Sequence, residues 1–391
     1  MSAPAAAGAP GHATGPVRAE RTEPGGHGGS RPPLPSLTGL RWLAALLVFG
    51  LHIDLAGYFG GRGGKVASWA FASGDTGVSF FFILSGFILM WSARPQDRAT
   101  RFWRRRIARI YPVHLVTAGL ALLMAYTVMP YMKPTGQETV ANLLLVHSWT
   151  YSWRETLNPV SWSLACEAFF YALFPLIAFL LRHSSARAAA AIAGLSALAA
   201  VFMPFVNTQF GLGWNDYYYP PARLPEFVLG VALARLMLLD RWRGPGLKTS
   251  LAITVVGYFL APELGGDHHA VGPLLGFALL IPAAARADLT GAASLWRRPV
   301  LVRLGELSFA FYMIHLLAIR FGERLFHAYS PRLPVLSALG ATAAALAASL
   351  ALSWLLYAGV ERPGRRLLLL RGRRSPADSP ATAARADRSR G

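Results

Sequence analysis

The stretch LTGLRWLAALLVFGLHI, Leu37–Ile53, decides how this chain must fold. It is apolar over nearly the length of a membrane-crossing helix, yet it carries Arg41 and His52. Eleven positions make about three helical turns, so both side chains point the same way, roughly 16 Å apart along the axis. Such groups usually face a protein interior or a wet cavity. The stretch therefore predicts a membrane helix with an inward face that binds an anion at one level and moves a proton at another.

Composition extends this prediction to the whole chain. Of 391 residues, 54% are hydrophobic and only 15% are charged, which is unusual for a soluble domain. Apolar segments of about twenty residues recur and predict an all-α, polytopic transmembrane helix bundle of about ten spans. The predicted spans are 37–56, 76–93, 111–130, 160–181, 187–206, 222–239, 248–262, 270–285, 304–321 and 335–358.

The net charge of +19 fits a membrane topology better than a nucleic-acid partner. Cations gather between alternate apolar segments, most densely in 93–110, and positively charged connections usually stay on the cytoplasmic side. Counting from 93–110 places both termini in the cytoplasm. The Ala-, Gly- and Pro-rich residues 1–35 and the basic residues 367–391 are predicted to be disordered cytoplasmic tails around one membrane domain, 36–366.

Glu167 is the predicted partner of His52. Counted from the expected ends of their spans, the two residues lie at nearly the same depth. A carboxylate beside an imidazole makes an oriented general base. The alternative is a pair that only holds two helices together.

Three arginines are candidates for binding a phosphate. Arg41 lies near the cytoplasmic end of the first span, and Arg106 and Arg109 of RFWRRRIARIYP are one helical turn apart. Guanidinium groups bind phosphate by paired hydrogen bonds. The alternatives are a snorkelling side chain for Arg41, and a topology signal or contacts with lipid head groups for the basic segment.

Ser308, Tyr312 and His315 fall on one helix face within LGELSFAFYMIHL. Three aligned polar groups in a membrane helix either line a substrate cavity or form hydrogen bonds between helices. Arg223 and Glu226 of RLPEFVLG can pair across one turn, most simply as a structural ion pair.

Other chemistries find little support. Asp267, His268 and His269 could attract a metal ion, but no further ligand accompanies them and no metal site is predicted. Cys166 is the single cysteine, so no internal disulfide forms, and it is expected to be a small buried hydrophobic residue.

These motifs, in this order, resemble those of the acyltransferase-3 family of integral-membrane proteins, which includes O-antigen and exopolysaccharide O-acetylases and antibiotic O-acyltransferases. The resemblance covers about Leu37 to Arg366. The motifs are Arg41 with His52, FFILSGF, RRIARIYP, SWSLACEAFFY around Glu167, RLPEFVLG, LGELSFAFYMIH and ERP at Glu361–Pro363.

The resemblance implies transfer of an acyl group, commonly acetyl from acyl-CoA, to a hydroxyl of a glycan, a lipid-linked sugar or an antibiotic, in a bacterial cytoplasmic membrane. It places Arg41, His52, Glu167 and the Arg106–Arg109 pair in the active site. The chain departs from the family pattern at Thr38, Trp42 and Phe309, where the family usually has an acidic residue, a glycine and a tyrosine. No cofactor is expected to stay bound, since acyl-CoA would be a co-substrate.

The predicted mechanism has His52 remove a proton from the acceptor hydroxyl as this attacks the thioester. An acyl-histidine relay across the membrane is the other route. Tyr312, His315 or Trp162 could stabilise the oxyanion, and the sequence does not choose among them. Two rival functions are a multi-span transporter or flippase, because buried charges also mark transport pathways, and a non-catalytic membrane scaffold.

Overall fold

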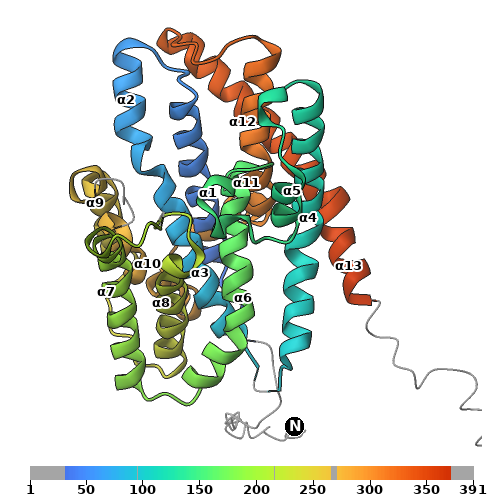
Figure 1. Cartoon of the computed structure of the whole chain (residues 1–391). Coiled ribbons are helices and arrows are strands. Elements are labelled where there is room, and N and C mark those ends of the chain that lie inside the picture. The colour runs from blue at the N-terminus through green and yellow to red at the C-terminus, as the bar shows by residue number, and fades with distance from the viewer. Residues whose placement is uncertain (1–30, 95, 215, 266–270, 371–391) are drawn as a thin grey trace, which may run out of the picture. The chain divides into compact units, whose positions relative to one another are not determined.

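The computed structural model describes residues 31–94, 96–214, 216–265 and 271–370. The chain divides into Met1–Arg31 and Pro32–Gly391, and the second unit holds the helices (Figure 1). Helices dominate and no β-strand occurs within the described ranges, which confirms the all-α fold. Most of the two predicted tails lies outside these ranges, although helix continues to Leu370, past the predicted boundary at 366.

Ten long helices form the bundle (Figure 1). They are α1 (Pro35–Leu55), α3 (Thr76–Ser92), α4 (Ala99–Thr127), α6 (Trp162–Leu181), α7 (Ala186–Phe210), α8 (Pro220–Leu238), α9 (Leu247–Gly265), α10 (Val271–Thr290), α11 (Pro299–Leu325) and α12 (Val335–Leu356). Shorter helices are α2 (Gly61–Phe71), α5 (Gly136–Leu143) and α13 (Arg362–Leu370), with a π-helical turn at Tyr357–Glu361.

Each predicted apolar segment coincides with one long helix, but the number of membrane spans is a separate quantity. Eight segments of the described chain are long and apolar enough to cross a membrane. Helices α8 and α9 are not among them. In α8 the reason is charge, because Arg223, Glu226 and Arg235 all lie within its nineteen residues. The chain is a multi-pass membrane protein, and the count of ten spans and the cytoplasmic termini stay predictions.

Helix α1 lies inside the bundle, packed against α2, α3, α10 and α11. One apolar stripe, which includes Leu40 and Ala44, joins the main core. A second stripe, which includes Ala45 and Phe49, packs against α11. A helix that is apolar on two sides is buried on both. Arg41 and His52 both lie on this helix, which explains why they face other helices.

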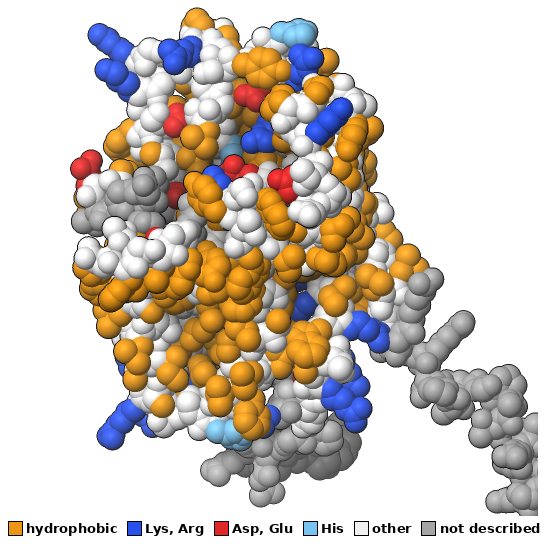
Figure 2. All heavy atoms as spheres, viewed as in Figure 1, with side chains coloured by type: hydrophobic (Ala, Val, Ile, Leu, Met, Phe, Trp, Pro, Cys, Tyr) orange, Lys and Arg blue, Asp and Glu red, His pale blue; other side chains and the backbone are white. Residues whose placement is uncertain are grey.

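The surface follows the same division. Figure 2 shows a broad band of apolar side chains around the middle and lower bundle. Basic side chains lie near both ends of this face, and the visible acidic ones lie in its upper part. An apolar band between two polar ends is the pattern that a hydrocarbon layer requires.

Helices α3 and α8 cross at two glycines. A Cβ atom on Gly86 would collide with the carbonyl oxygen of Phe227, and one on Gly230 would collide with that of Ile83. Each glycine therefore accepts the backbone of the other helix. Small residues at such crossings let membrane helices approach closely, where dispersion contacts replace the missing hydrophobic drive.

Gly230→Ala should lower the thermal stability of the protein in detergent. The added methyl group forces α3 and α8 apart, which typically costs about 1–3 kcal/mol. The measurement is the melting temperature of the purified protein. Gly119→Ala is the matched control, since a Cβ there meets open space and a helical alanine is worth about 0.5–1 kcal/mol over glycine. Equal melting temperatures for the two variants would contradict the crossing.

Candidate active site

His52 of α1 meets His315 of α11. Nε2 of His315 lies 3.2 Å from Nδ1 of His52, and the ring centroids are 5.0 Å apart. His315 is fully buried and stacks on Phe311, with 5.6 Å between the centroids. His52 is half-buried. We call these two residues the histidine pair.

Backbone carbonyls fix the hydrogens of this pair. Nδ1 of His52 lies 2.8 Å from the Val48 carbonyl oxygen, and Nδ1 of His315 lies 2.8 Å from that of Tyr312. A carbonyl only accepts, so we assign a hydrogen to each Nδ1. The one Nδ1 hydrogen of His52 is then shared between the Val48 carbonyl oxygen and Nε2 of His315, and Nε2 of His52 keeps a lone pair. That arrangement lets His52 take up a proton and lets His315 stabilise the resulting cation.

Tyr312 connects the histidine pair with α6. Its hydroxyl donates to the Val160 carbonyl at 3.1 Å and accepts from the Ser163 hydroxyl at 2.9 Å. Trp162 is buried beside Ser163, and its ring lies 4.7–4.9 Å from those of two tyrosines, Tyr217 and Tyr218. The predicted residues Tyr312, His315 and Trp162 therefore surround one region of the bundle.

Ser308 has a local role. Its hydroxyl donates to the Gly305 carbonyl on its own helix at 2.8 Å. Gly305 is where α11 touches the backbone of α1 at Thr38. Ser308 thus shares the face of Tyr312 and His315 but lies at a helix crossing below them.

A second polar region lies lower along α1. We call it the arginine cluster. It comprises Arg41 of α1, Arg106 and Arg109 of α4, Glu167 of α6, and Glu361 at the end of the π-helical turn, all linked through their charges. Tyr171 donates a 2.8 Å hydrogen bond to Glu167 and lies 3.3 Å from Ser85 of α3. Arg41, Glu167 and the arginine pair, predicted separately, are thus brought together.

The cluster carries more positive than negative charge and few direct contacts. In the described part of the chain, neither Arg41 nor Arg109 forms an ion pair or hydrogen bond. Nε of Arg106 and Oε2 of Glu361 are buried and likewise lack a partner among the described residues. Buried polar groups without partners are expensive. An anion could satisfy the unpaired guanidinium donors, whereas Oε2 of Glu361 can only accept a hydrogen bond.

The structure does not pair Glu167 with His52, because His52 meets His315 and the Val48 carbonyl, and Glu167 accepts its hydrogen bond from Tyr171. Ser163, not Glu167, is the α6 residue that meets Tyr312. Along α6, Glu167 lies four residues beyond Ser163. Along α11, His315 lies three residues beyond Tyr312. The two helices run in opposite directions, so both steps increase the separation. At 1.5 Å per residue, this separates Glu167 from the histidine pair by about 10 Å along the bundle axis. Glu167 instead compensates the positive charge of the arginine cluster.

A buried network, missed by sequence reasoning, anchors the loop 128–161. The side chain of Asn158 donates a 2.7 Å hydrogen bond to the Met313 carbonyl of α11. The side chain of Asn142 donates a 3.2 Å hydrogen bond to the Ser161 hydroxyl. Ser161 in turn lies 3.3 Å from Nε2 of His147. These residues sit in a segment with ordinary loop composition. The one available signal was its short apolar run, 140–149, which folds as α5 and a 3-10 turn instead of crossing.

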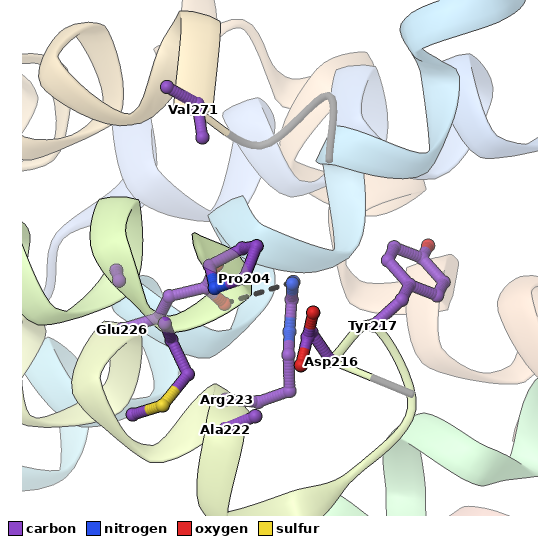
Figure 3. A pocket seen from close by; sticks show the side chains of 9 residues that line it. Pro204, Asp216, Tyr217, Ala222, Arg223, Glu226 and Val271 are labelled. Carbon is purple, nitrogen blue, oxygen red and sulfur yellow. Dashed lines mark ion pairs between the residues drawn. The ribbon is translucent and has the colours of Figure 1, made fainter. Parts of the chain in front are cut away.

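The predicted ion pair of α8 is present. Nη2 of Arg223 lies 3.1 Å from Oε2 of Glu226 and donates to the Ser79 hydroxyl at 2.7 Å. Figure 3 shows the pair beside a small pocket that Asp216 and Tyr217 also line. The volume of about 20 Å³ suits one water molecule. Because Ser79 belongs to α3, the hydrogen bond from Arg223 links α8 to α3.

Cys166 and the possible metal ligands are the remaining candidates from the sequence. Cys166 is fully buried, with its thiol 3.5 Å from the Tyr218 carbonyl oxygen. The described residues contain no cluster of three or more potential metal ligands. Asp267, His268 and His269 lie outside them.

Comparison with known proteins connects this geometry to a family. A family model described as an acyltransferase domain matches residues 34–358. Acyltransferase MdmB of Streptomyces mycarofaciens is 40% identical over 376 residues, 89% of this chain and 96% of that protein. Peptidoglycan O-acetyltransferase OatA of Listeria monocytogenes is 27% identical over 232 residues, 54% of this chain but 35% of OatA. A putative O-acetyltransferase of Staphylococcus aureus is 25% identical over 325 residues, covering 74% and 51%.

No solved structure matches the chain. The chain spans nearly all of MdmB but about half or less of the two O-acetyltransferases. These relatives favour an enzyme that transfers acyl groups over a transporter or a scaffold.

Acidification should loosen the loop 128–161. Burial, with the nearby His114, lowers the pKa of His147 to about 3 from its ordinary 6.5. The neutral ring is therefore the folded form, and its stabilising effect is full above pH 6.5 and falls as the pH drops toward 3. Each pH unit is worth at most about 1.4 kcal/mol. Melting temperatures measured between pH 7 and 4 should fall less for His147→Gln than for the unchanged protein, and parallel curves would contradict this.

Proposed function

We propose, from the premise that this chain belongs to the acyltransferase-3 family of integral-membrane enzymes, that it moves an acyl group from acyl-CoA to a hydroxyl of a carbohydrate or glycosylated molecule. Acetyl is the simplest group. The observation that carries the proposal is α1 itself. It presents a phosphate-binding guanidinium and a proton-accepting imidazole to two separate polar regions of one bundle.

The arginine cluster is the proposed site for the phosphates of acyl-CoA. Three guanidinium groups outnumber two carboxylates, and the spare donors of Arg41 and Arg109 suit phosphate oxygens. Glu167 and Glu361 reduce the cost of burying three cations. The flexible pantetheine arm then extends along α1 toward His52, over the roughly 16 Å that separates the two levels.

At the histidine pair, the proposed reaction is direct acyl transfer. Nε2 of His52 takes the proton of the acceptor hydroxyl while the oxygen attacks the thioester carbon. The carbon–sulfur bond breaks, and the CoA thiolate leaves with the proton from His52. His315 stabilises the imidazolium through its Nε2 lone pair. An ester and free CoA thiol result, so no oxidant, metal or further reactant enters.

Trp162 is the proposed donor to the oxyanion. Tyr312 already donates to Val160, and Nδ1 of His315 already donates to its own helix. The indole N–H of Trp162 forms no hydrogen bond among the described residues, although the side chain is buried beside Ser163. A donor held ready without a ground-state partner is what oxyanion stabilisation requires.

His52→Gln should lower the rate of transfer by about 100- to 10,000-fold, because the amide cannot accept the proton. The measurement is transfer of label from acetyl-CoA to hydroxylated acceptors by purified protein. His183→Ala changes an exposed residue just beyond the C-terminal end of α6. It is the control and should keep full activity. Full activity of His52→Gln in folded protein would refute the assigned base.

Arg41→Gln and Arg109→Gln should weaken binding of acyl-CoA. A lost charge-assisted hydrogen bond costs about 1.5–3 kcal/mol, so the KM for the donor should rise about 10- to 100-fold. Dephospho-CoA and pantetheine thioesters should be less sensitive to the change. Arg101→Gln removes the same charge from an exposed site of α4 and is the matched control. A similar KM for all three variants would indicate a topology signal instead of a phosphate site.

A further inference from the structure

A cleft between α1 and α9 belongs to neither polar region described above. Its volume is about 190 Å³, and Figure 1 shows α9 at the edge of the bundle. Leu43 and Leu47 form its wall on α1, and Leu251 and Val255 form its wall on α9. At 100° per residue, the α1 wall lies about 120–160° around the helix from Arg41. The cleft is therefore on the side of α1 that faces away from the arginine cluster.

The polar side chains that line the cleft are already hydrogen-bonded. The Thr254 hydroxyl donates to the Ser250 carbonyl of its own helix at 2.8 Å, and the Tyr258 hydroxyl donates to the Ala70 carbonyl of α2 at 2.8 Å. The rest of the lining is apolar. An apolar cavity without free polar groups does not hold water. The cleft is therefore suited to a hydrocarbon occupant.

The cleft lies where hydrocarbon is the solvent. Helices α1, α3 and α10 all contribute to its lining, and each belongs to a segment that is long and apolar enough to cross a membrane. Val255 and Phe259 on the α9 wall are 46% and 38% exposed, so the cleft opens to the surroundings of the bundle. In a bilayer these surroundings are lipid chains.

The shape of the cleft selects a chain over a bulkier group. Its lining runs from Leu40 to Leu47 along α1 and from Leu251 to Phe259 along α9, about 10 to 12 Å at 1.5 Å per residue. An apolar cavity of about 150 Å³ holds a single benzene ring. A volume of about 190 Å³ spread over this length accepts a segment of one unbranched chain, and it is too small for a helix of a partner protein.

One end of the cleft is closed by α2. The hydrogen bond from Tyr258 to Ala70 ties α9 to the end of α2, and Trp69 stacks on Phe259 with 4.5 Å between the ring centroids. A chain that occupies the cleft therefore ends near these two contacts, and the rest of the molecule extends toward the end marked by Leu251.

A cation lies beyond the other end. Lys248 precedes Leu251 by three residues, so both side chains lie on one face of α9. Lys248 is exposed and has no ion-pair partner among the described residues. Lysines at a membrane surface attract anionic lipid head groups. An apolar cleft with a lysine at its mouth matches both parts of an anionic phospholipid.

We infer that the cleft binds one acyl chain of an anionic phospholipid, whose phosphate contacts Lys248. This lipid goes beyond the proposed reaction, because it is neither donor nor acceptor. It fills the space between α1 and α9, a helix whose closest contacts are with α10. There, a Cβ atom on Gly257 would collide with the carbonyl oxygen of Gly272. The bound lipid thus joins α9 to α1.

The first test measures the melting temperature of the full-length protein, purified in detergent and stripped of lipid. Dioleoyl phosphatidylglycerol should raise it by a few degrees, because a ligand that binds only the folded protein stabilises it, and dioleoyl phosphatidylcholine should raise it less. Val255→Trp fills the cleft from its exposed rim and should abolish the rise. Val256→Trp is the matched control, because Val256 is 58% exposed and lies outside the lining.

The head group is tested separately. Lys248→Gln should lower the apparent affinity for phosphatidylglycerol about 5-fold and leave that for phosphatidylcholine unchanged. Lys65→Gln removes an exposed lysine near the start of α2 and is the control. Equal responses of the unchanged protein to the two lipids would overturn the anionic assignment. Equal responses of the two tryptophan variants to phosphatidylglycerol would overturn the cleft as the site.

The second test locates the chain in the unchanged protein. Phosphatidylglycerol with a diazirine in its acyl chain should label peptides from the cleft walls on α1 and α9. Excess phosphatidylglycerol should suppress this labelling, and palmitoyl-CoA should not. Suppression by palmitoyl-CoA alone would assign the cleft to the chain of an acyl donor and overturn the inference. Both tests measure binding without turnover, so their failure is distinct from failure of the proposed function.

Discussion

Burying three guanidinium groups among apolar helices is costly, and much of this structure is arranged to offset that cost. Each ion taken from water into a protein interior costs several kcal/mol unless opposite charge or hydrogen bonds compensate. Glu167 and Glu361 supply two charges, the second from a π-helical turn, a distortion that often marks functional sites. One positive charge is left over. In the proposed function, the phosphates of the donor supply the compensating negative charge.

Helix α1 links this constraint to the chemistry. Its two apolar stripes bury it on both sides, so its polar residues have no route to lipid. Arg41 enters the arginine cluster, and His52 enters the histidine pair three turns away. A rigid helix fixes that spacing, and a donor anchored by its phosphates can place its thioester at a constant distance. The long flexible arm of the proposed acyl-CoA donor would suit such a separation.

The sequence predicted the helices well because apolar runs and their flanking charges are local properties. It also identified Arg41, Arg106, Arg109 and Glu167, which the structure gathers into one cluster. The partner of His52 could not be predicted in the same way. A depth counted from the predicted end of a span does not take account of where each helix begins. The predicted depth of Glu167 was therefore one to two helical turns too close to that of His52. His315 was a candidate by its helix face, but which residue it meets depends on how α11 crosses α1.

The polar loop 128–161 shows a different limit. Its asparagines and histidines have an ordinary loop composition, and only the fold turns them into a buried network bonded to α11. That network has a consequence for the reaction. A loop tied to the helix that carries His315 helps to hold this histidine in place beside the proposed base, His52. The loop, α11 and the histidine pair then form one rigid arrangement, and a base held in this way is the preorganised group that the proposed proton transfer needs.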